Sequence, residues 1–211
     1  MAKSFGDVAG AAKKGKQYKW VDGEQTIRLV GNILPRYVYW KSTGEFNIPV
    51  ECLGFDRDLE KFTNIEKDWF QDMFPEQKCA WSYMATAIDP EDKSKTILVP
   101  LKKKMYQQIQ DVAAELGDPT NVDTGWDIIV NRVKTGPANY NVEYTVKQLK
   151  CKNRALSAEE KAAVEAMPSI DTLVPRQTAD EQKAFILATF FNKDDTETDE
   201  EAAKEFDDIP Q

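Results

Sequence analysis

The sequence predicts a mainly β protein with a few helices, built on a small antiparallel barrel and ending in a disordered acidic tail. Several short segments alternate apolar and polar residues, which is the pattern of half-buried strands. Strands and helices alternate too rarely for a parallel α/β sheet. Residues 193–211 hold nine acids and two lysines, a composition typical of disorder.

Local patterns place the elements along the chain. Strands are expected at 25–30, 37–40, 46–50, 79–88, 96–101, 126–133 and 140–149. Helices are expected within 58–73, over 102–116, from Ser157 and from Thr178. Gly117 ends the second helix, and Ser157 with Glu160 forms a capping box that begins the third. Five or six strands interrupted by one helix fit the five-stranded oligonucleotide-binding (OB) barrel.

Charge divides the chain into four parts. We expect a flexible basic arm (1–17), a barrel core (18–154), a helical extension (155–192) and the acidic tail (193–211). The first twenty residues carry a net charge of +4, whereas the extension carries −3 and the tail −7. The whole chain has a net charge of −8, so that residues 1–154 carry +2. Such a gradient is typical of a binding domain with an opposing tail.

The composition excludes several classes of protein. With 0 His, the chain lacks Ser/His and Cys/His nucleophile pairs and the commonest transition-metal ligand. Cys52, Cys79 and Cys151 are widely spaced, which indicates reduced thiols in the cytoplasm, that of a host cell if the protein is viral. No apolar run could span a membrane, and the first twenty residues lack the apolar centre of a secretory signal. We therefore expect a protein that binds rather than an enzyme, without metal or cofactor.

Binding of a single-stranded nucleic acid requires cations for the phosphates and flat rings on which bases stack. The candidate cations are Arg28, Arg36, Lys41, Lys102, Lys103, Lys104, Arg132 and Lys134. The candidate rings are Tyr37, Tyr39, Trp40, Trp81, Tyr83, Trp126, Tyr140 and Tyr144. Trp81 and Tyr83 are two residues apart on a strand and therefore share a face. The lysines at 102–104 begin a helix, where the dipole does not favour cations, and this indicates an external anion.

Each of these features also has a simpler explanation. Aromatic residues in strands more often fill the core than stack on bases, and a run of lysines is usually a solvated face. An acidic tail can serve solubility alone. The end of this tail places apolar side chains among carboxylates, which favours docking to a partner. The candidate partner-binding residues are Phe206, Asp207, Asp208, Ile209 and Pro210.

Four stretches of the core carry a resemblance to a known family. Residues 23–29 are similar to a barrel strand with an arginine, and 81–90 to an aromatic strand that leads into an Asp-Pro turn. Residues 101–106 are similar to a lysine-rich helix start, and 125–140 to a final hairpin. Together they resemble the helix-destabilising single-stranded-DNA-binding protein of T-even-like bacteriophages, over roughly residues 20–150.

The resemblance implies an OB core that binds single-stranded DNA without sequence preference during replication, recombination and repair. It implies that the tail recruits replication proteins and that the arm supports cooperative self-association. The arm's candidate residues are Lys3, Lys13, Lys14 and Lys16. The family's better-known members hold a structural zinc in an insertion after the third strand. Here residues 51–79 contain two cysteines and no His, so we expect a zinc-free version in which a helix around Trp69 fills the space.

Two other functions are compatible with the same residues. A single-stranded-RNA-binding OB protein uses the same kinds of rings and cations. A protein-interaction adaptor would use the barrel without binding nucleic acid.

Overall fold

A computed structural model describes residues 16–44, 47–137 and 141–191 of the chain. Its elements are β1 (Gly23–Ile27), β2 (Leu29–Ser42), β3 (Asn47–Glu51), β4 (Phe55–Asp56), β5 (Lys61–Phe62), α1 (Trp69–Met73), β6 (Ala80–Ile88), β7 (Thr96–Lys102), α2 (Lys103–Leu116), β8 (Trp126–Lys134), β9 (Val142–Val146), the 3-10 turn η2 (Gln148–Lys150), β10 (Lys152–Asn153), α3 (Ala158–Glu165), α4 (Ile170–Leu173), α5 (Ala179–Ile186) and the π turn η3 (Leu187–Phe191). The fold is mainly β, as predicted.

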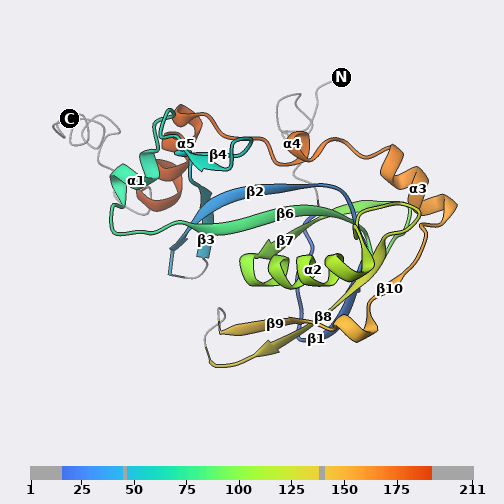
Figure 1. The fold of residues 1–211 in the computed structure, drawn as a ribbon. Helices are drawn as coiled ribbons and strands as arrows, with labels where there is room; N and C mark the ends of the chain where they lie inside the picture. The colour runs from blue at the N-terminus through green and yellow to red at the C-terminus, as the bar shows by residue number, and fades with distance from the viewer. Residues whose placement is uncertain (1–15, 45–46, 138–140, 192–211) are drawn as a thin grey trace, which may run out of the picture.

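Two four-stranded antiparallel sheets share one long run of chain. In the first sheet the order is β3-β2-β6-β7, and in the second β8 pairs with β1, β9 and β10. Only Arg28 separates β1 from β2, so a single strand from residue 23 to 42 crosses from one sheet to the other. The continuous order is therefore β7-β6-β2/β1-β8-β9, which curls as Figure 1 shows.

The bend in this long strand is located at Gly31. Its φ is +65°, a conformation that glycine adopts without steric cost. The register of β2 against β6 shifts between Val30 and Ile33, which marks a β-bulge. A Cβ at Gly31 would lie 2.8 Å from the Met167 side chain. Both the backbone conformation and the close approach therefore require glycine here.

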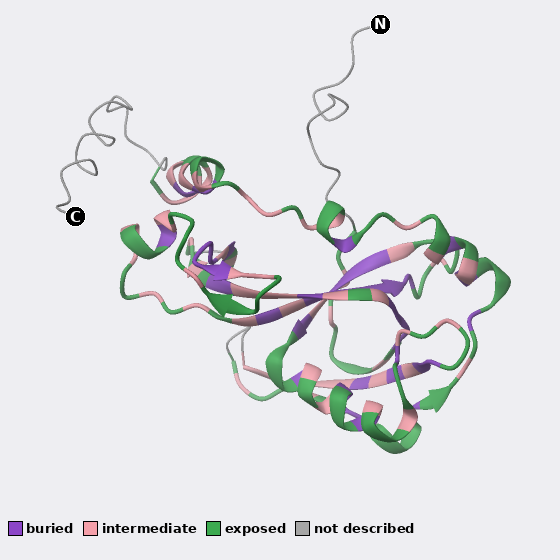
Figure 2. Cartoon of the chain, turned by 45° about the horizontal axis from the view of Figure 1, so that its top comes forward, coloured by how far each residue is buried: buried purple, intermediate pink, exposed green. Residues whose placement is uncertain are grey.

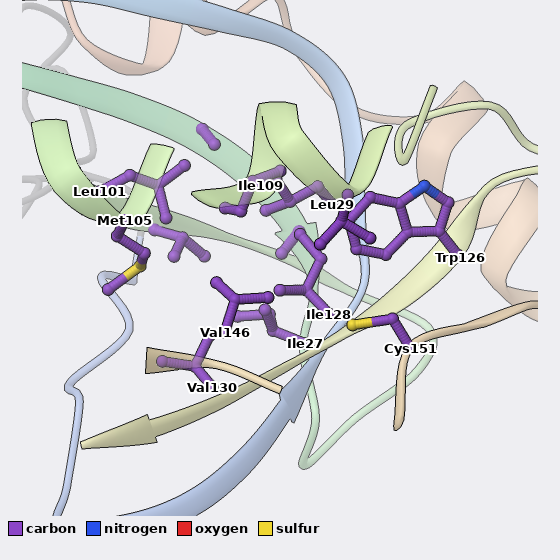
Figure 3. Packing of buried hydrophobic residues seen from close by; sticks show 14 of the residues in the cluster. Ile27, Leu29, Leu101, Met105, Ile109, Trp126, Ile128, Val130, Val146 and Cys151 are labelled. Carbon is purple, nitrogen blue, oxygen red and sulfur yellow. The ribbon is translucent and has the colours of Figure 1, made fainter. Parts of the chain in front are cut away.

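The main core lies between the two sheets and α2. Ile27, Leu29 and Ile128 contribute from the crossing strand and β8, and Met105 and Ile109 from α2 (Figure 3). Trp126 is fully buried there, and its indole N–H donates to the carbonyl of Gly117 at 2.8 Å. This partner is what permits a Trp at the centre of the core.

The segment at 16–20 lies along the free edge of β7. The Tyr18 N–H donates to the Leu98 carbonyl at 2.7 Å, and the Leu98 N–H donates to Lys16 at 2.9 Å. The Trp20 indole donates to the Pro100 carbonyl at 2.9 Å, and its ring lies 5.9 Å from that of Tyr144 in β9. The segment thus covers an edge that would otherwise expose unpaired backbone.

Residues 155–191, which we call the C-terminal strap, cover the outer face of β2 and β6. Ile170 packs on Leu34, Met84 and Leu98, and Leu156 packs on Val30. Figure 1 shows this stretch running across β2 and β6, and Figure 2 shows the buried positions beneath it.

Hydrogen bonds from the half-buried Arg176 and the fully buried Gln182 fasten the strap to residues 43–79, the insertion between β2 and β6. The guanidinium of Arg176 donates to the carbonyls of Phe55 (2.8 Å) and Leu53 (2.6 Å). Gln182, with no exposed surface, accepts from the Trp69 N–H at 2.8 Å and donates to the Glu51 carbonyl at 2.9 Å. Because such groups are costly to leave unpaired, these bonds fix where the insertion lies against the barrel.

The structure confirms most of the predicted elements. The strands predicted from 79 and 96 and the helix from 102 agree with β6, β7 and α2 within two residues. The predicted strands at 25–30 and 37–40 belong to one long strand interrupted at Arg28. Capping boxes begin α3 at Ser157 and α5 at Thr178. None of the described helices is long and apolar enough to cross a membrane.

The prediction of a helix over 58–73 is wrong for most of its length. Only Trp69–Met73 is helical, and a two-stranded ribbon of β4 and β5 precedes it. Glu60 and Asn64 have φ of +49° and +50°, which a right-handed helix cannot accommodate. The Asp56 carboxylate accepts from two following N–H groups and so stabilises a turn.

The ion pairs of Arg154 allow a prediction about stability and pH. Arg154 donates to Asp127 at 2.8 Å and to Glu160 at 2.7 Å. Burial alone would raise the pKa of Glu160, but hydrogen bonds from Arg154 and Ser157 outweigh it and hold that pKa at about 2, below the ordinary 4.5. The stabilisation is therefore present above about pH 4.5 and is lost as the pH falls towards 2.

Replacing Glu160 with Gln should lower the free energy of unfolding by about 2–3 kcal/mol at pH 7 and by much less at pH 3. Denaturant titration at the two pH values measures this. Glu159→Gln, a change at the exposed neighbouring position, is the control and should have little effect at either pH. A deficit in Glu160→Gln that is the same at both pH values would contradict the ionic origin.

Candidate nucleic-acid interface

Five aromatic rings form a continuous row on the face of β2 and β6 that the strap leaves uncovered. Tyr37 and Trp81 lie opposite each other on neighbouring strands, with ring centroids 4.6 Å apart. Trp81 stacks on Tyr83 at 5.4 Å, with planes only 5° apart. Tyr83 stacks at 4.1 Å on Tyr106 of α2, and Phe62 of β5 lies 4.7 Å from Tyr37. The insertion, the sheet and α2 each contribute to this row, which we call the aromatic row.

The rings of the aromatic row are unequally accessible. Phe62, at one end, is 49% exposed, whereas the other four are half-buried. Because successive rings contact one another, a base cannot insert between them, and the free ring surface is greatest at Phe62. The sequence patterns identified Tyr37, Trp81 and Tyr83 but missed Phe62 and Tyr106. Tyr106 follows Lys102 by four residues, one helical turn, so the sequence spacing could have placed its ring beside the lysine. Phe62 was missed because residues 58–73 were predicted to be helical.

Cations lie next to the Tyr106 end of the row. The ammonium of Lys102 lies 5.1 Å from the centre of the Tyr144 ring. Burial and the nearby Arg132 lower the pKa of Lys102. Lys103 and Lys104 are exposed in the first turn of α2, which contains no acidic residue. The start of this helix therefore combines uncompensated positive charge with its dipole, and an anion outside the protein would be attracted there.

The hairpin of β8 and β9 extends the same positive region. Arg132 and Tyr144 lie directly opposite each other in the pairing of the two strands. Arg132 forms an ion pair with Asp22, and its Nε is buried without a partner among the described residues. Lys134 is exposed two residues farther along β8. The structure thus brings Lys102, Arg132 and Tyr144 together, although Asp22 already neutralises part of this charge.

Tyr39 is part of the core and does not belong to the aromatic row. It is 1% exposed, and its ring stacks on Phe70 at 4.5 Å. Its hydroxyl can donate to Asp68 (3.2 Å) or to Gln71 (3.1 Å), and burial raises the pKa of the phenol. The prediction that this ring stacks on bases is therefore wrong.

The two arginines predicted on the crossing strand also lie away from the aromatic row. Arg28 is 4% exposed, at the junction of β1 and β2. Nine residues at about 3.3 Å each place it on the order of 30 Å from Tyr37 along the strand. Arg36 pairs with Ser82 on the face that the strap covers, and burial lowers its pKa. Neither side chain can contact a strand bound along the row, which corrects both predictions.

Two predicted lysines have internal partners. Lys41 lies 4.0 Å over the Phe74 ring of the insertion. Lys16 pairs with Asp89 at 2.9 Å and with Glu91 at 2.7 Å, and these bonds raise its pKa to about 12. Lys16 is therefore fastened to the turn between β6 and β7. Several other candidates lie outside the described residues: Lys3, Lys13, Lys14, Tyr140, Phe206, Asp207, Asp208, Ile209 and Pro210.

The insertion contains two neighbouring thiols. A hydrogen bond from Cys52 lowers the pKa of the Cys79 thiol to about 7. Cys52 itself lies 3.3 Å from the Tyr39 hydroxyl. Within 16–44, 47–137 and 141–191, no three metal-ligating residues of the types His, Cys, Asp and Glu are grouped as an ion site would need. The helix α1 and the β4–β5 ribbon occupy the space beside these thiols.

Comparison with known proteins gives one informative match. No family model matches the chain. A protein of Escherichia phage T5, named a probable ssDNA-binding protein, is 29% identical over an alignment of 263 positions. The alignment covers 99% of this chain and 100% of the phage protein. The similarity thus extends over the barrel, the strap and the terminal segments.

Replacing Tyr39 with Phe should lower the free energy of unfolding by about 1 kcal/mol, because only the buried hydroxyl and its hydrogen bonds are lost. The stacked ring remains, so no binding property of the aromatic row should change. Denaturant titration measures the stability. A loss of oligonucleotide affinity at unchanged stability would show instead that Tyr39 contacts the ligand.

Proposed function

We propose that this chain is a sequence-nonspecific single-stranded-DNA-binding protein and not an enzyme. The observation that carries the proposal is the aromatic row, which ends beside an uncompensated cluster of lysines at the start of α2. Rings stack on any base, and cations bind any phosphate, so such a surface binds without reading sequence. The name of the phage T5 relative, a probable ssDNA-binding protein, agrees with this function.

We further propose that the core is an OB barrel. The strand order β7-β6-β2/β1-β8-β9, with α2 between β7 and β8, is the order expected of that fold. In OB folds the ligand lies across the second and third strands, between the loops that join strands 1 to 2 and strands 4 to 5. The corresponding loops here are the insertion at 43–79 and the β8–β9 hairpin. Phe62 belongs to the first and Arg132 to the second, with Trp81 and Tyr83 between them.

The proposed path of the DNA follows from the two kinds of contact. Bases would stack on the exposed end of the row at Phe62, and the backbone would pass Lys102, Lys103 and Lys104. Each phosphate neutralised should contribute a slope of about −0.7 to log affinity against log salt. Single-stranded DNA fits better than a duplex, since stacking on the row requires bases that are not already paired and stacked.

We propose roles in phage DNA replication, recombination and repair, with two terminal segments acting beside the core. Residues 193–211 would recruit partner proteins through Phe206 and Ile209 among their carboxylates. The lysine-bearing arm at 1–17 would support cooperative self-association on DNA. Both roles rest on the composition of these segments, and the T5 relative aligns over almost the whole chain.

Replacing Phe62 with Ala should weaken the binding of labelled oligo-dT about 5- to 150-fold, because one stacking contact contributes about 1–3 kcal/mol. Fluorescence anisotropy at fixed salt measures the affinity. Trp40→Ala is the matched control. Trp40 is equally exposed, at 50%, but alternation along β2 places it on the opposite face from Tyr37.

The proposal requires Phe62→Ala to lose affinity while Trp40→Ala stays within about twofold of the wild type. Equal effects of the two changes would sink the assignment of the row. No binding of oligo-dT by the wild type would indicate a protein-interaction adaptor. Tighter binding of a matched RNA oligomer would indicate an RNA-binding protein.

Removal of residues 193–211 should tighten DNA binding, most visibly at low salt. The deletion takes away seven net negative charges and leaves a chain of net charge −1. A tethered acidic segment has a high effective concentration near the cationic surface and competes with phosphate there, and salt screens this competition. Affinity of the full-length and truncated chains at two salt concentrations tests it. Equal affinities at low salt would leave partner recruitment as the tail's role.

A further inference from the structure

Arg132, in the positive region beside α2, has a carboxylate of the protein itself as its partner. Its Nη1 forms an ion pair with Asp22. The side chain of Arg132 is 17% exposed, whereas that of Asp22 is 58% exposed. The carboxylate therefore occupies a place that solvent reaches, at the outer end of a guanidinium that is otherwise largely covered.

The chain holds Asp22 in this place from both sides. The side chain of Gln25 binds the preceding residue twice, since it accepts from the Val21 N–H at 3.2 Å and donates to the Val21 carbonyl at 2.5 Å. The following residue, Gly23, has a φ of +99°, which glycine adopts without steric cost. Gly23 also lies directly opposite Arg132 in the pairing of β1 with β8. The fold of this segment thus places Asp22 beside Arg132.

More cations than carboxylates surround this ion pair. Lys102 lies 5.1 Å over the Tyr144 ring, and Tyr144 is directly opposite Arg132 in the pairing of β8 with β9. Burial, and then the charge of Arg132, lower the pKa of Lys102, so the two cations are close. Lys134 lies two residues beyond Arg132 on the same face of β8. Neither lysine has an ion-pair partner among the described residues.

The neighbouring acids of this sheet, Glu24 and Glu143, lie on its other face. Glu24 is opposite Asn131, the residue before Arg132, and Glu143 comes directly before Tyr144. Alternation along the strands therefore turns both carboxylates away from Arg132. Glu24 forms an ion pair with Lys150 at 2.7 Å instead. Within the part of the chain that the structure describes, Asp22 is thus the carboxylate that neutralises this group of cations.

A phosphate can take the place of the Asp22 carboxylate. Both groups are anions whose oxygens accept from a guanidinium. A DNA backbone that passes Lys102 comes next to Arg132, and the place that Asp22 occupies is open to solvent. Because an ion pair with an exposed member contributes little to stability, its exchange for a phosphate costs little.

We propose that Arg132 and Lys102 form a phosphate subsite of the DNA interface, and that Asp22 fills this subsite in the free protein and leaves it when DNA binds. Asp22 is then an internal competitor that lowers both the affinity for DNA and its dependence on salt. The inference rests on the proposed function, since the ligand of the subsite is the backbone of single-stranded DNA.

The test is Asp22→Asn, which keeps the size of the side chain and removes its charge. Labelled oligo-dT should bind about two- to fivefold more tightly at low salt, and the difference should shrink as salt screens the charges. The slope of log affinity against log salt should steepen by about 0.7, because one further cation becomes available to a phosphate. Fluorescence anisotropy over a series of salt concentrations measures both.

Glu24→Gln is the matched control, because it removes an equal charge from an exposed acid on the other face of the sheet. Its affinity should stay within about twofold of the wild type, with an unchanged salt slope. A double-mutant cycle with Arg132→Met separates exchange at the subsite from a general effect of charge. In the Arg132→Met background, Asp22→Asn should no longer tighten binding. If Arg132→Met does not fold, the salt slopes of Asp22→Asn and Glu24→Gln decide.

Three results would overturn the inference while leaving DNA binding itself intact. They are unchanged or weaker binding by Asp22→Asn, an equal gain in Glu24→Gln, and an equal gain in the presence and absence of Arg132. If neither the wild type nor Asp22→Asn binds oligo-dT, the proposed function fails together with the inference. Binding by the wild type therefore distinguishes the two failures.

Discussion

The fold depends on one continuous run of chain that forms a strand in both sheets. Residues 23–27 pair with β8, and residues 29–38 pair with β6, with no loop between the two pairings. A strand can do this only if it bends sharply, and the bulge with the left-handed Gly31 supplies the bend. The core of Ile27, Leu29 and Trp126 forms inside that bend. The part of this strand beyond the bend pairs with β6 and places Tyr37 opposite Trp81.

The two faces of β2 and β6 have different roles because side chains alternate along them. One face carries Leu34, Met84 and the half-buried Arg36, and the C-terminal strap covers it. On the other face, the residues that pack in the core are small, and the residues beyond the core have large rings. The same alternation places Ala85 and Ala87 in the core and Trp81 and Tyr83 in the aromatic row. One strand thus contributes both to the core and to the aromatic row.

Hydrogen bonds from polar side chains of the strap, in addition to apolar contacts, determine where the insertion lies. Gln182 and Arg176 bond to backbone carbonyls of residues 51–55, so the ribbon that carries Phe62 is held against the barrel. Each such bond contributes little net stability, but breaking it leaves a buried group unpaired. Arg28 shows the opposite case, since it is held in place with much of its hydrogen-bonding capacity unused. The hydrogen bonds of Gln182 and Arg176 therefore fix the geometry of the insertion.

The sequence by itself determined the local structure: the strands at 79–88 and 96–101, the helix of α2, the capping boxes at Ser157 and Thr178, and Trp81 and Tyr83 sharing a face. These follow from periodicity and from bonds between residues close in the chain. Tertiary structure decided which cations and rings are accessible. Arg28 and Tyr39 follow the same alternation as exposed residues would, but contacts from Asn121 and Phe70, distant in sequence, bury them. Phe62 lies in the row because the backbone there, with positive φ at Glu60 and Asn64, forms a ribbon instead of the expected helix. Burial depends on which segments pack against each other in the tertiary structure, so the residue pattern along one segment does not predict it.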